Sequence, residues 1–362
     1  MIIKNGSKIK RIYICHTYYN VFVSLLKEFN YQRIDQNKGS IALSMMSTKF
    51  NDLAARLKCL NIFNEVLELN EVHPTKFKQK FKYSINQSRW WNPYQWVINN
   101  VLYWRYIAKQ TGKNINIDFN KYAKTFVYCD SDPIGQYLNY RRINYIAVED
   151  GLEAVRINAV EKSVMFLIPK IILSKLGISY MQNGYSRYAR EIEVNSSNGI
   201  FSFGRKIVEV SRKELFNKLT QSEKELIYDT FILGNITDRF ENGKKNALLL
   251  AGQLCNPKDS IKIYRDIINE YCYGFNVYIK PHPIDDNDYA TEFPDCVVLE
   301  RFFPLEIFNI KCSLNIERMI SVTSVLDDYS FAKEKFRLGL KFLAKYDYPG
   351  MLTQPTDYFA IK

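Results

Sequence analysis

The chain has 362 residues, and its 50 Lys and Arg against 38 Asp and Glu give a net charge of +12. At about 150 residues per domain, this length predicts two domains, each large enough to bury its own core. Hydrophobic residues make up 47% and charged residues 24%, a composition that excludes disordered and collagen-like chains. The charge is uneven: residues 1–200 carry 28 basic and 15 acidic side chains, and residues 201–362 carry 22 and 23. The basic half is expected to meet an anionic partner.

The short apolar run near the N-terminus and the longest apolar stretch favour neither export nor membrane insertion. Only Ile12–Cys15 form an apolar run near the N-terminus, too short for a signal peptide. The longest apolar stretch, Val164–Ile178, is broken by Pro169, Lys170 and Lys175 and falls short of the ~20 residues that span a bilayer. We therefore expect a cytoplasmic protein, and the sequence leaves peripheral association with the inner membrane open.

The cysteines are scattered and contain no CxxC pair. They are Cys15, Cys59, Cys129, Cys255, Cys272, Cys296 and Cys312. This spacing favours neither a zinc site nor a disulfide framework, and it is typical of small buried side chains in a reducing compartment.

Apolar runs alternate with helical patterns through the first part of the chain. Ile9–Cys15 predicts a strand, and Thr17–Phe29 predicts the helix that follows it. Pro93–Gln110 predicts a helix that begins near Pro93, and Ser211–Phe231 predicts a polar helix. Further strand candidates are Ser40–Ser47, Val66–Leu69, Thr125–Tyr128 and Tyr145–Val148.

The alternation restarts after the loop Asp238–Lys245. The predicted strands are Asn246–Gly252, Phe275–Ile279, Val297–Leu299 and Met319–Val322, and the predicted helices are Ile261–Tyr273 and the closing helix Ser330–Lys345. Two successive halves of this kind predict an α/β fold of two Rossmann-like domains that face a central cleft. The expected divisions are residues 1–240, a first Rossmann-like domain, residues 241–330, a second Rossmann-like domain, and residues 331–362, a closing helix and tail.

The three histidines stand in different contexts. His282 lies in the segment YIKPHP at the end of a predicted strand, with Lys280 before it and Pro283 after it. Because prolines fix the backbone, this segment is expected to hold an imidazole and an ammonium rigidly, a pair suited to a phosphate leaving group. His16 follows the first strand, where ligands often bind, although capping or packing is the more common role. His73, in a His-Pro loop, is not expected to have a functional role.

Two adjacent carboxylates, Glu149 and Asp150, precede Gly151 at the end of a predicted strand. A tight turn there would expose an acid that could act as a general base, provided that its pKa is tuned toward neutrality. Acidic turn residues are common, so the pair gains weight only in combination with the YIKPHP segment.

Polar residues after the C-terminal strands complete the predicted site. Glu306 follows Pro304 in the first turn of a predicted helix and could accept hydrogen bonds from a ribose. Ser321, Thr323 and Ser324 follow a strand and could hold a phosphate. Another loop at a strand end contains Gly252, Gln253 and Asp259.

No cofactor or metal motif is found. The sequence has no Walker A loop, no GxGxxG and no HExxH, and no carboxylate cluster has obvious ligand spacing. We therefore expect a reaction without cofactor or metal, in which cationic side chains and helix dipoles neutralise the phosphate.

In combination, these motifs resemble those of bacterial sialyltransferases of the two-Rossmann GT-B architecture. The shared pattern is Glu149–Gly151 in the first domain and His282–Pro283, Pro304–Glu306 and Thr323–Ser324 in the second. The segments IYICHTYYNVFVSLL and NALLLAGQ look most like the lipooligosaccharide and capsule sialyltransferases of glycosyltransferase family 52.

This resemblance implies transfer of sialic acid from CMP-sialic acid, the donor substrate, to a sugar hydroxyl, commonly of galactose, with inversion. It makes Asp150 or Glu149 the general base, with Asp259 as a competing candidate. It makes His282 the group that protonates or hydrogen-bonds the departing phosphate. The implied binding residues are Ser324 with Thr323 or Ser321 for the phosphate, and Glu306 for the ribose. The resemblance also makes residues 1–240 the acceptor-binding domain and residues 241–330 the CMP-sugar-binding domain.

Two other functions remain open at this point. A transferase of a related keto-sugar such as Kdo would also use a CMP donor. A nucleic-acid-binding protein would suit the charge and the 15% aromatic content, but the basic residues are dispersed and no such motif appears, so no nucleic-acid partner is expected. The expected partners are a CMP-sugar donor and a galactose-terminated glycan, for which Ser84–Trp96 offers aromatic surfaces if it does not pack in the core. The sequence leaves a homodimer open.

Overall fold

The computed structural model divides into two compact units, one ending at Leu219 and the other beginning at Thr220. It describes residues 10–46, 50–72, 92–151, 161–200, 202–232, 236–240, 244–252, 254, 257–310, 314–327 and 329–346. The division falls before the expected boundary at residue 240, because helix α8 (Gln221–Phe231) packs against the 3-10 helix η3 (Leu305–Ile310) of the second unit.

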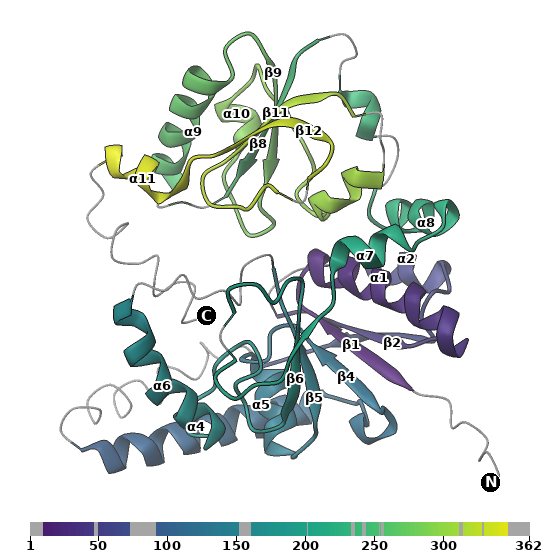
Figure 1. Cartoon of the computed structure of the whole chain (residues 1–362), viewed down its shortest axis with the longest axis vertical. Coiled ribbons are helices and arrows are strands. Elements are labelled where there is room, and N and C mark those ends of the chain that lie inside the picture. The colour runs from purple at the N-terminus through teal and green to yellow at the C-terminus, as the bar shows by residue number, and fades with distance from the viewer. Residues whose placement is uncertain are drawn as a thin grey trace. The chain divides into compact units, whose positions relative to one another are not determined.

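The first unit is built on a parallel sheet, whose described strands have the order β3-β2-β1-β4-β5-β6-β7. The strands are β1 (Arg11–Cys15), β2 (Ser40–Ser44), β3 (Glu65–Leu69), β4 (Lys124–Val127), β5 (Tyr145–Val148), β6 (Ala189–Val194) and β7 (Ile207–Glu209). The chain adds β2 and β3 on one side of β1 and the later strands on the other (Figure 1). All residues of β1 are buried, as in parallel sheets that helices cover on both faces.

Helices cover both faces of this sheet. They are α1 (Tyr18–Asp35), α2 (Leu53–Cys59), α4 (Pro93–Asn114), α5 (Pro133–Tyr140), α6 (Glu161–Lys175) and α7 (Arg212–Asn217), with the 3-10 helix η1 (Phe119–Lys121). Helix α1 begins at a capping box, in which Thr17 and Asn20 bond each other's backbone N–H groups. Helix α1 contacts α7, and α4 contacts α5; Figure 1 shows the two pairs on opposite faces.

The second unit has a smaller parallel sheet, whose described strands have the order β10-β9-β8-β11-β12. The strands are β8 (Asn246–Ala251), β9 (Asn276–Pro281), β10 (Val297–Val298), β11 (Ile316–Ser321) and β12 (Ala332–Arg337). Besides α8 and η3, the helical segments are η2 (Ile236–Arg239), α9 (Pro257–Tyr271), α10 (Tyr289–Glu292), α11 (Gly339–Leu343) and η4 (Ala344–Tyr346). Both units are therefore Rossmann-like, as predicted.

The predicted closing helix Ser330–Lys345 is wrong. Its first half is the edge strand β12, which pairs in parallel with β11 from Ala332 opposite Ile316 to Arg337 opposite Ser321. The Lys and Glu side chains of β12, which favour a helix locally, here lie on an exposed edge strand, where charged residues prevent further strand pairing. Helical structure begins only with α11 at Gly339, whose φ of +74° ends the strand, and continues into η4.

Two other differences between the predicted and the observed elements are local. The predicted helix Ser211–Phe231 is two helices, because Ser211 caps α7 and Thr220 caps α8. Strands β6 and β7 were not predicted. Among the described residues, no helix is long and apolar enough to cross a membrane.

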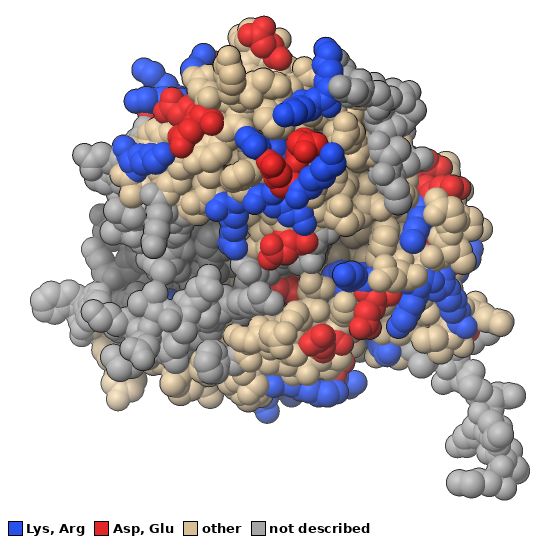
Figure 2. All heavy atoms as spheres, turned by 45° about the horizontal axis from the view of Figure 1, so that its top comes forward, with Lys and Arg blue, Asp and Glu red and all other residues tan. Residues whose placement is uncertain are grey.

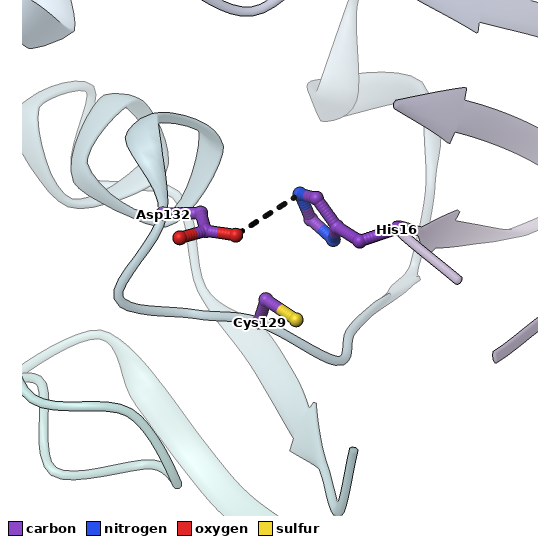
Figure 3. Close-up of side chains that lie close together, drawn as sticks. All are labelled: His16, Cys129 and Asp132. Carbon is purple, nitrogen blue, oxygen red and sulfur yellow. Dashed lines mark ion pairs between the residues drawn. The ribbon is translucent and has the colours of Figure 1, made fainter. Parts of the chain in front are cut away.

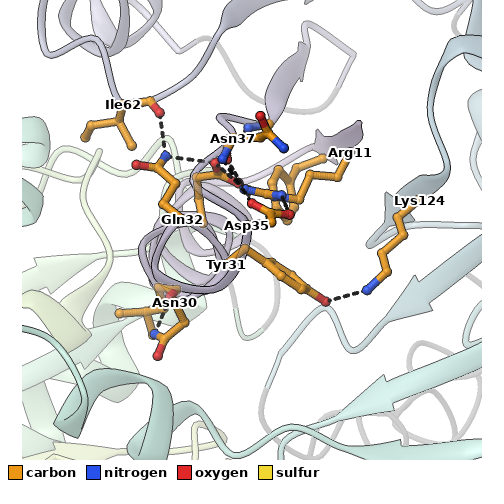
Figure 4. Close-up of polar contacts among 12 residues, drawn as sticks. Arg11, Asn30, Tyr31, Gln32, Asp35, Asn37, Ile62 and Lys124 are labelled. Atoms are coloured by element: carbon orange, nitrogen blue, oxygen red, sulfur yellow. Dashed lines mark hydrogen bonds and ion pairs between the residues drawn. The ribbon is translucent and has the colours of Figure 1, made fainter. Parts of the chain in front are cut away.

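A buried charge network joins β1 to the C-terminal end of α1. Arg11 and Glu28 are 1% and 0% exposed and form two hydrogen bonds, of 2.8 and 3.0 Å. Arg11 also pairs with Asp35 at 2.6 Å and donates to the carbonyl of Asn37 (Figure 4). Glu28 also accepts the N–H of Gly39 at 2.7 Å, and Gly39 immediately precedes β2. The Arg11–Glu28 pair thus holds β1, α1 and the start of β2 together.

We predict that Glu28→Gln lowers the free energy of unfolding by about 3 kcal/mol, because it leaves the Arg11 guanidinium buried with an incomplete set of negative partners. Urea unfolding followed by circular dichroism measures the change. Glu68→Gln, the same substitution at an exposed position of β3, is the control and should change stability by less than about 0.5 kcal/mol. Equal unfolding curves for the two variants would contradict the role of the pair.

Candidate active site

Each sheet carries candidate residues at the carboxyl ends of the strands where the strand order reverses. The reversal lies between β1 and β4 in the first unit and between β8 and β11 in the second. Loops leave such a point in opposite directions and open a crevice in which α/β proteins bind ligands. The sequence motifs of both halves therefore lie at the edges where a ligand is expected.

His282 follows β9 and is held against the end of β8. Its N–H donates to the carbonyl of Ala251 at 2.7 Å, and a Cβ added to Gly252 would lie 3.6 Å from the His282 Cβ. The His282 side chain is exposed, and its Nδ1 accepts the N–H of Ile284 at 3.3 Å. With Nδ1 as an acceptor, the neutral ring carries its proton on Nε2, which can then donate to a phosphate oxygen.

Lys280 is buried in β9. Its Nζ donates to two main-chain carbonyls, that of Arg301 at 3.0 Å among them, and lies 4.5 Å from the centre of the Phe303 ring. Burial lowers the pKa of Lys280 to about 7, although the charge of Glu306 acts to raise it. The Lys280 amine thus ties the segment after β10 to β9, and the cationic role at a phosphate stays a prediction.

The hydroxyl groups after β11 form a small turn. Oγ of Ser321, which is 1% exposed, accepts the N–H of Ser324 at 2.8 Å. Thr323 and Ser324 are exposed. Ser321 therefore shapes the turn, while Thr323 and Ser324 are the hydroxyls that a ligand can reach.

The remaining residues predicted in this unit differ in their surroundings. Glu306 begins η3, is half-buried and accepts the Tyr329 hydroxyl at 3.3 Å. Pro283 is half-buried in the turn after His282. Asp259 lies in the first turn of α9 and lines a groove of about 510 Å³ between α9 and residues 287–292. Gln253 lies outside the described residues.

In the first unit, the two adjacent carboxylates have different roles. Glu149 is 4% exposed, and its Oε2 accepts the N–H of Asn195 at 2.6 Å, which anchors the loop after β6. Asp150 is half-buried, and it accepts hydrogen bonds from Asn20 Nδ2 at 2.6 Å and from the Cys129 thiol at 3.2 Å. Asp150 is therefore the carboxylate of the pair that lies among polar side chains at the sheet edge.

A group of titratable side chains surrounds His16 at the same edge. His16 Nε2 lies 2.8 Å from Glu71 Oε1 and 3.7 Å from Asp132 Oδ2. Burial lowers the pKa of His16, but the Glu71 charge and hydrogen bond outweigh it and raise the pKa to about 9. Burial and neighbouring carboxylates raise the pKa of Asp132 to about 7, against the opposing effect of His16. Figure 3 shows His16, Cys129 and Asp132 facing one another across the ends of β1 and β4.

This group was largely missed by the sequence analysis. His16 was considered, with capping or packing as its more common role; Glu71, Cys129 and Asp132 were not singled out. The available signal was their position, because each follows a strand of the parallel sheet: Glu71 follows β3, and the other two follow β4. His73 and most of Ser84–Trp96 lie outside the described residues.

The lowered pKa of Lys280 makes a prediction about stability. Between pH 7 and the ordinary value of 10.5, the unfolded chain binds more protons at this side chain than the folded chain. Burial of this side chain therefore costs stability in full at pH 7 and below, and the cost shrinks as the pH rises from 7 toward 10.5, by at most ~1.4 kcal/mol per pH unit. Lys280→Met should remove this dependence, measured by urea unfolding from pH 7 to 9. Lys262→Met, at an exposed position of α9, should keep it; a Lys280→Met curve parallel to that of the unmodified protein would refute the assignment.

Comparisons with known proteins agree with the motifs. Residues 102–326 match glycosyltransferase family 52. An uncharacterized protein of Haemophilus influenzae is 24% identical over 241 residues, 62% of this chain and 73% of that protein. Among solved structures, the GT-B domain of a sialyltransferase from Photobacterium damselae is 11% identical with a TM-score of 0.45, covering 91% of this chain and all of that domain. A UDP-N-acetylglucosamine 2-epimerase from Rickettsia bellii is 11% identical with a TM-score of 0.42, covering 88% and 80%.

The family match confirms the resemblance found in the motifs. It covers more than half of the chain, including Glu149, Asp150, His282, Glu306 and Ser324. The protein therefore belongs to glycosyltransferase family 52 and is a glycosyltransferase of two Rossmann-like units, as in the GT-B architecture.

Proposed function

We propose that the protein transfers sialic acid from CMP-Neu5Ac to a galactose-type hydroxyl of a bacterial surface glycan, a lipooligosaccharide or a capsule. The observation that carries this proposal is the placement of His282. Its backbone is bonded to the end of β8, and Nδ1 is occupied by the Ile284 N–H. Nε2 is therefore the donor that an anionic leaving group would meet.

In the proposed reaction, a base takes the proton from the acceptor hydroxyl while its oxygen attacks the anomeric carbon. The bond from that carbon to the phosphate oxygen breaks, and CMP departs with the bonding electrons. His282 Nε2–H donates to the phosphate, and the exposed hydroxyls of Thr323 and Ser324 hold it. Glu306 binds the ribose, and Gly252, Gln253, Lys280, Pro283 and Ser321 complete the donor site. Attack on the face opposite the leaving group gives inversion.

We propose Asp150 as the general base. Glu149 is nearly fully buried and is bonded to the backbone of Asn195, whereas Asp150 is half-buried and meets the side chains of Asn20 and Cys129. A carboxylate that is partly open to solvent can receive and release a proton in each cycle. Asp259, on α9 of the other unit, is the alternative base.

The alternatives are weaker for different reasons. A Kdo-type donor shares the CMP moiety, so the same residues would serve it. A nucleic-acid partner calls for a continuous basic surface, but Figure 2 shows Lys and Arg interspersed with Asp and Glu on the face it presents. Some of these side chains pair directly, such as Arg239 with Glu300 and Arg318 with Glu334, each at 2.7 Å.

We expect the protein to release CMP from CMP-Neu5Ac and to form sialyllactose when lactose is present. Added Mg²⁺ or Mn²⁺ should not raise the rate, because we assign charge neutralisation at the phosphate to protein groups. Chromatography of CMP and of the labelled sugar measures both products, and CMP-Kdo serves as the competing donor. Turnover of CMP-Kdo alone would replace the proposed donor, and no turnover together with salt-sensitive nucleic-acid binding would refute the enzyme function.

His282→Ala and Asp150→Asn should each lower kcat by about 10²–10⁴-fold, the usual contribution of a general acid or base. Steady-state kinetics with saturating lactose measures the loss. His73→Ala is the matched control, because His73 has no predicted role and its variant should keep the rate.

The same assay separates the candidate bases. Glu149→Gln and Asp259→Asn complete the set, with circular dichroism to verify folding. A loss of activity in Asp259→Asn with a normal rate in Asp150→Asn would move the base to α9. A normal rate in His282→Ala would contradict the observation on which the proposal rests.

A further inference from the structure

His16 has a buried nitrogen atom that no protein group satisfies. The ring is fully buried, and its Nδ1 has no hydrogen-bond partner among the described residues. Whether Nδ1 carries a proton or a lone pair, burying it without a partner costs about 1–3 kcal/mol. Two carboxylates lie beside this ring, because Glu71 Oε1 is 2.8 Å and Asp132 Oδ2 is 3.7 Å from Nε2. The surroundings therefore favour a positive charge at this position.

Two further ligand atoms lie close to the His16 ring. One ligand atom each from His16, Cys129 and Asp132 lie within 4.8 Å of one another. In Figure 3, the ion-pair line to Asp132 leaves from Nε2, and Cys129 lies on the side of the ring that carries Nδ1. Cys129 is 8% exposed, and the Asp132 side chain is 26% exposed. A nitrogen, a sulfur and an oxygen ligand atom thus lie close together, and the Asp132 side is open to solvent.

The other side of the ring has the support that a metal-binding histidine needs. Histidine ligands usually donate their second ring N–H to a carboxylate, which fixes the tautomer and the ring orientation. Glu71 takes this place, with its Oε1 2.8 Å from His16 Nε2. Glu71 is itself held by the Ser44 hydroxyl at 2.5 Å and by the N–H of Ile134 at 2.7 Å. The orientation of His16 is therefore set by groups that do not depend on the metal.

We propose that His16 Nδ1, the Cys129 thiolate and an Asp132 carboxylate oxygen form a Zn²⁺ site at the carboxyl edge of the first sheet. Thiolate, imidazole and carboxylate together select zinc over Mg²⁺ or Ca²⁺, which prefer oxygen ligands. In tetrahedral zinc sites these atoms are ~3.3–3.6 Å apart, so the Asp132 side chain turns from Nε2 toward Nδ1 as the metal enters. Cys129 releases to solvent the proton that it now donates to Asp150, and a water molecule takes the fourth position.

The zinc would connect the loops that follow β1 and β4, the two strands that meet at the reversal point. His16 follows β1, Cys129 follows β4, and Asp132 directly precedes α5. The ion would crosslink the loops on which Asp150 depends, through Asn20 and Cys129. It is not assigned to the donor phosphate, and its metal-binding test does not depend on the outcome of the transferase assay.

Metal binding by the full chain tests the site. After removal of metal with a chelator, the protein is titrated with Co²⁺, and bound Zn²⁺ is measured by competition with a chromophoric chelator. We expect one equivalent per chain, with a thiolate-to-cobalt charge-transfer band. Cys129→Ser should abolish the band and weaken Zn²⁺ binding at least 100-fold; Cys59→Ser, at an exposed cysteine of α2, should keep both. Glu71→Gln should weaken binding by about 10–100-fold.

Two measurements keep the test decisive if Cys129→Ser does not fold. Asp132→Asn changes a partly exposed side chain and should weaken Zn²⁺ binding while circular dichroism stays unchanged. X-ray absorption of the zinc-loaded protein should show one sulfur at ~2.3 Å with nitrogen and oxygen ligands at ~2.0–2.2 Å. No stoichiometric binding, a charge-transfer band that is lost in Cys59→Ser, or a zinc shell without sulfur would each overturn the proposal.

Discussion

The reversal of strand order in each parallel sheet is the constraint on which the candidate sites depend. All paired strands described in the two units run parallel, so their carboxyl ends lie along one edge of each sheet. A polar residue that follows any of these strands is brought to that edge whatever its distance along the chain. Backbone hydrogen bonding then sets the fine geometry, as where the His282 N–H extends the β8–β9 ladder by bonding Ala251. The chemistry of both units follows from this geometry.

Features encoded within a few residues could be predicted from the sequence. The alternation of apolar runs with helical patterns predicted the α/β class, and the segment around His282 predicted an imidazole at a strand end. Both depend on local patterns, since prolines and strand periodicity act over short distances. The difference between Glu149 and Asp150 was not visible, because it depends on Asn195 and Asn20, which the fold brings in from β6 and α1.

Features made by distant residues could not be predicted in this way. Residues 332–337, AKEKFR, have helical composition, but pairing with β11 makes them an edge strand. The cysteine spacing favoured no zinc site, yet His16, Cys129 and Asp132 come together because β1 and β4 are neighbours in the sheet. A ligand set taken from the ends of two strands far apart in the sequence leaves no spacing signature. Only the sheet order, with β4 placed beside β1, makes such a group recognisable.

The fold changes the interpretation of the charge distribution. The excess of basic residues lies in residues 1–200, yet the edge of the first sheet is acidic, with Glu71, Asp132 and Asp150 around one histidine. Such an edge suits the removal of a proton from a neutral sugar hydroxyl, or the binding of a cation, and it repels a nucleotide phosphate. The anionic donor is therefore expected at the edge of the second sheet, where His282 and the hydroxyls after β11 offer donors. We therefore propose that the acceptor binds at the first unit and the donor at the second, whereas the net charge of each half alone would favour the opposite assignment.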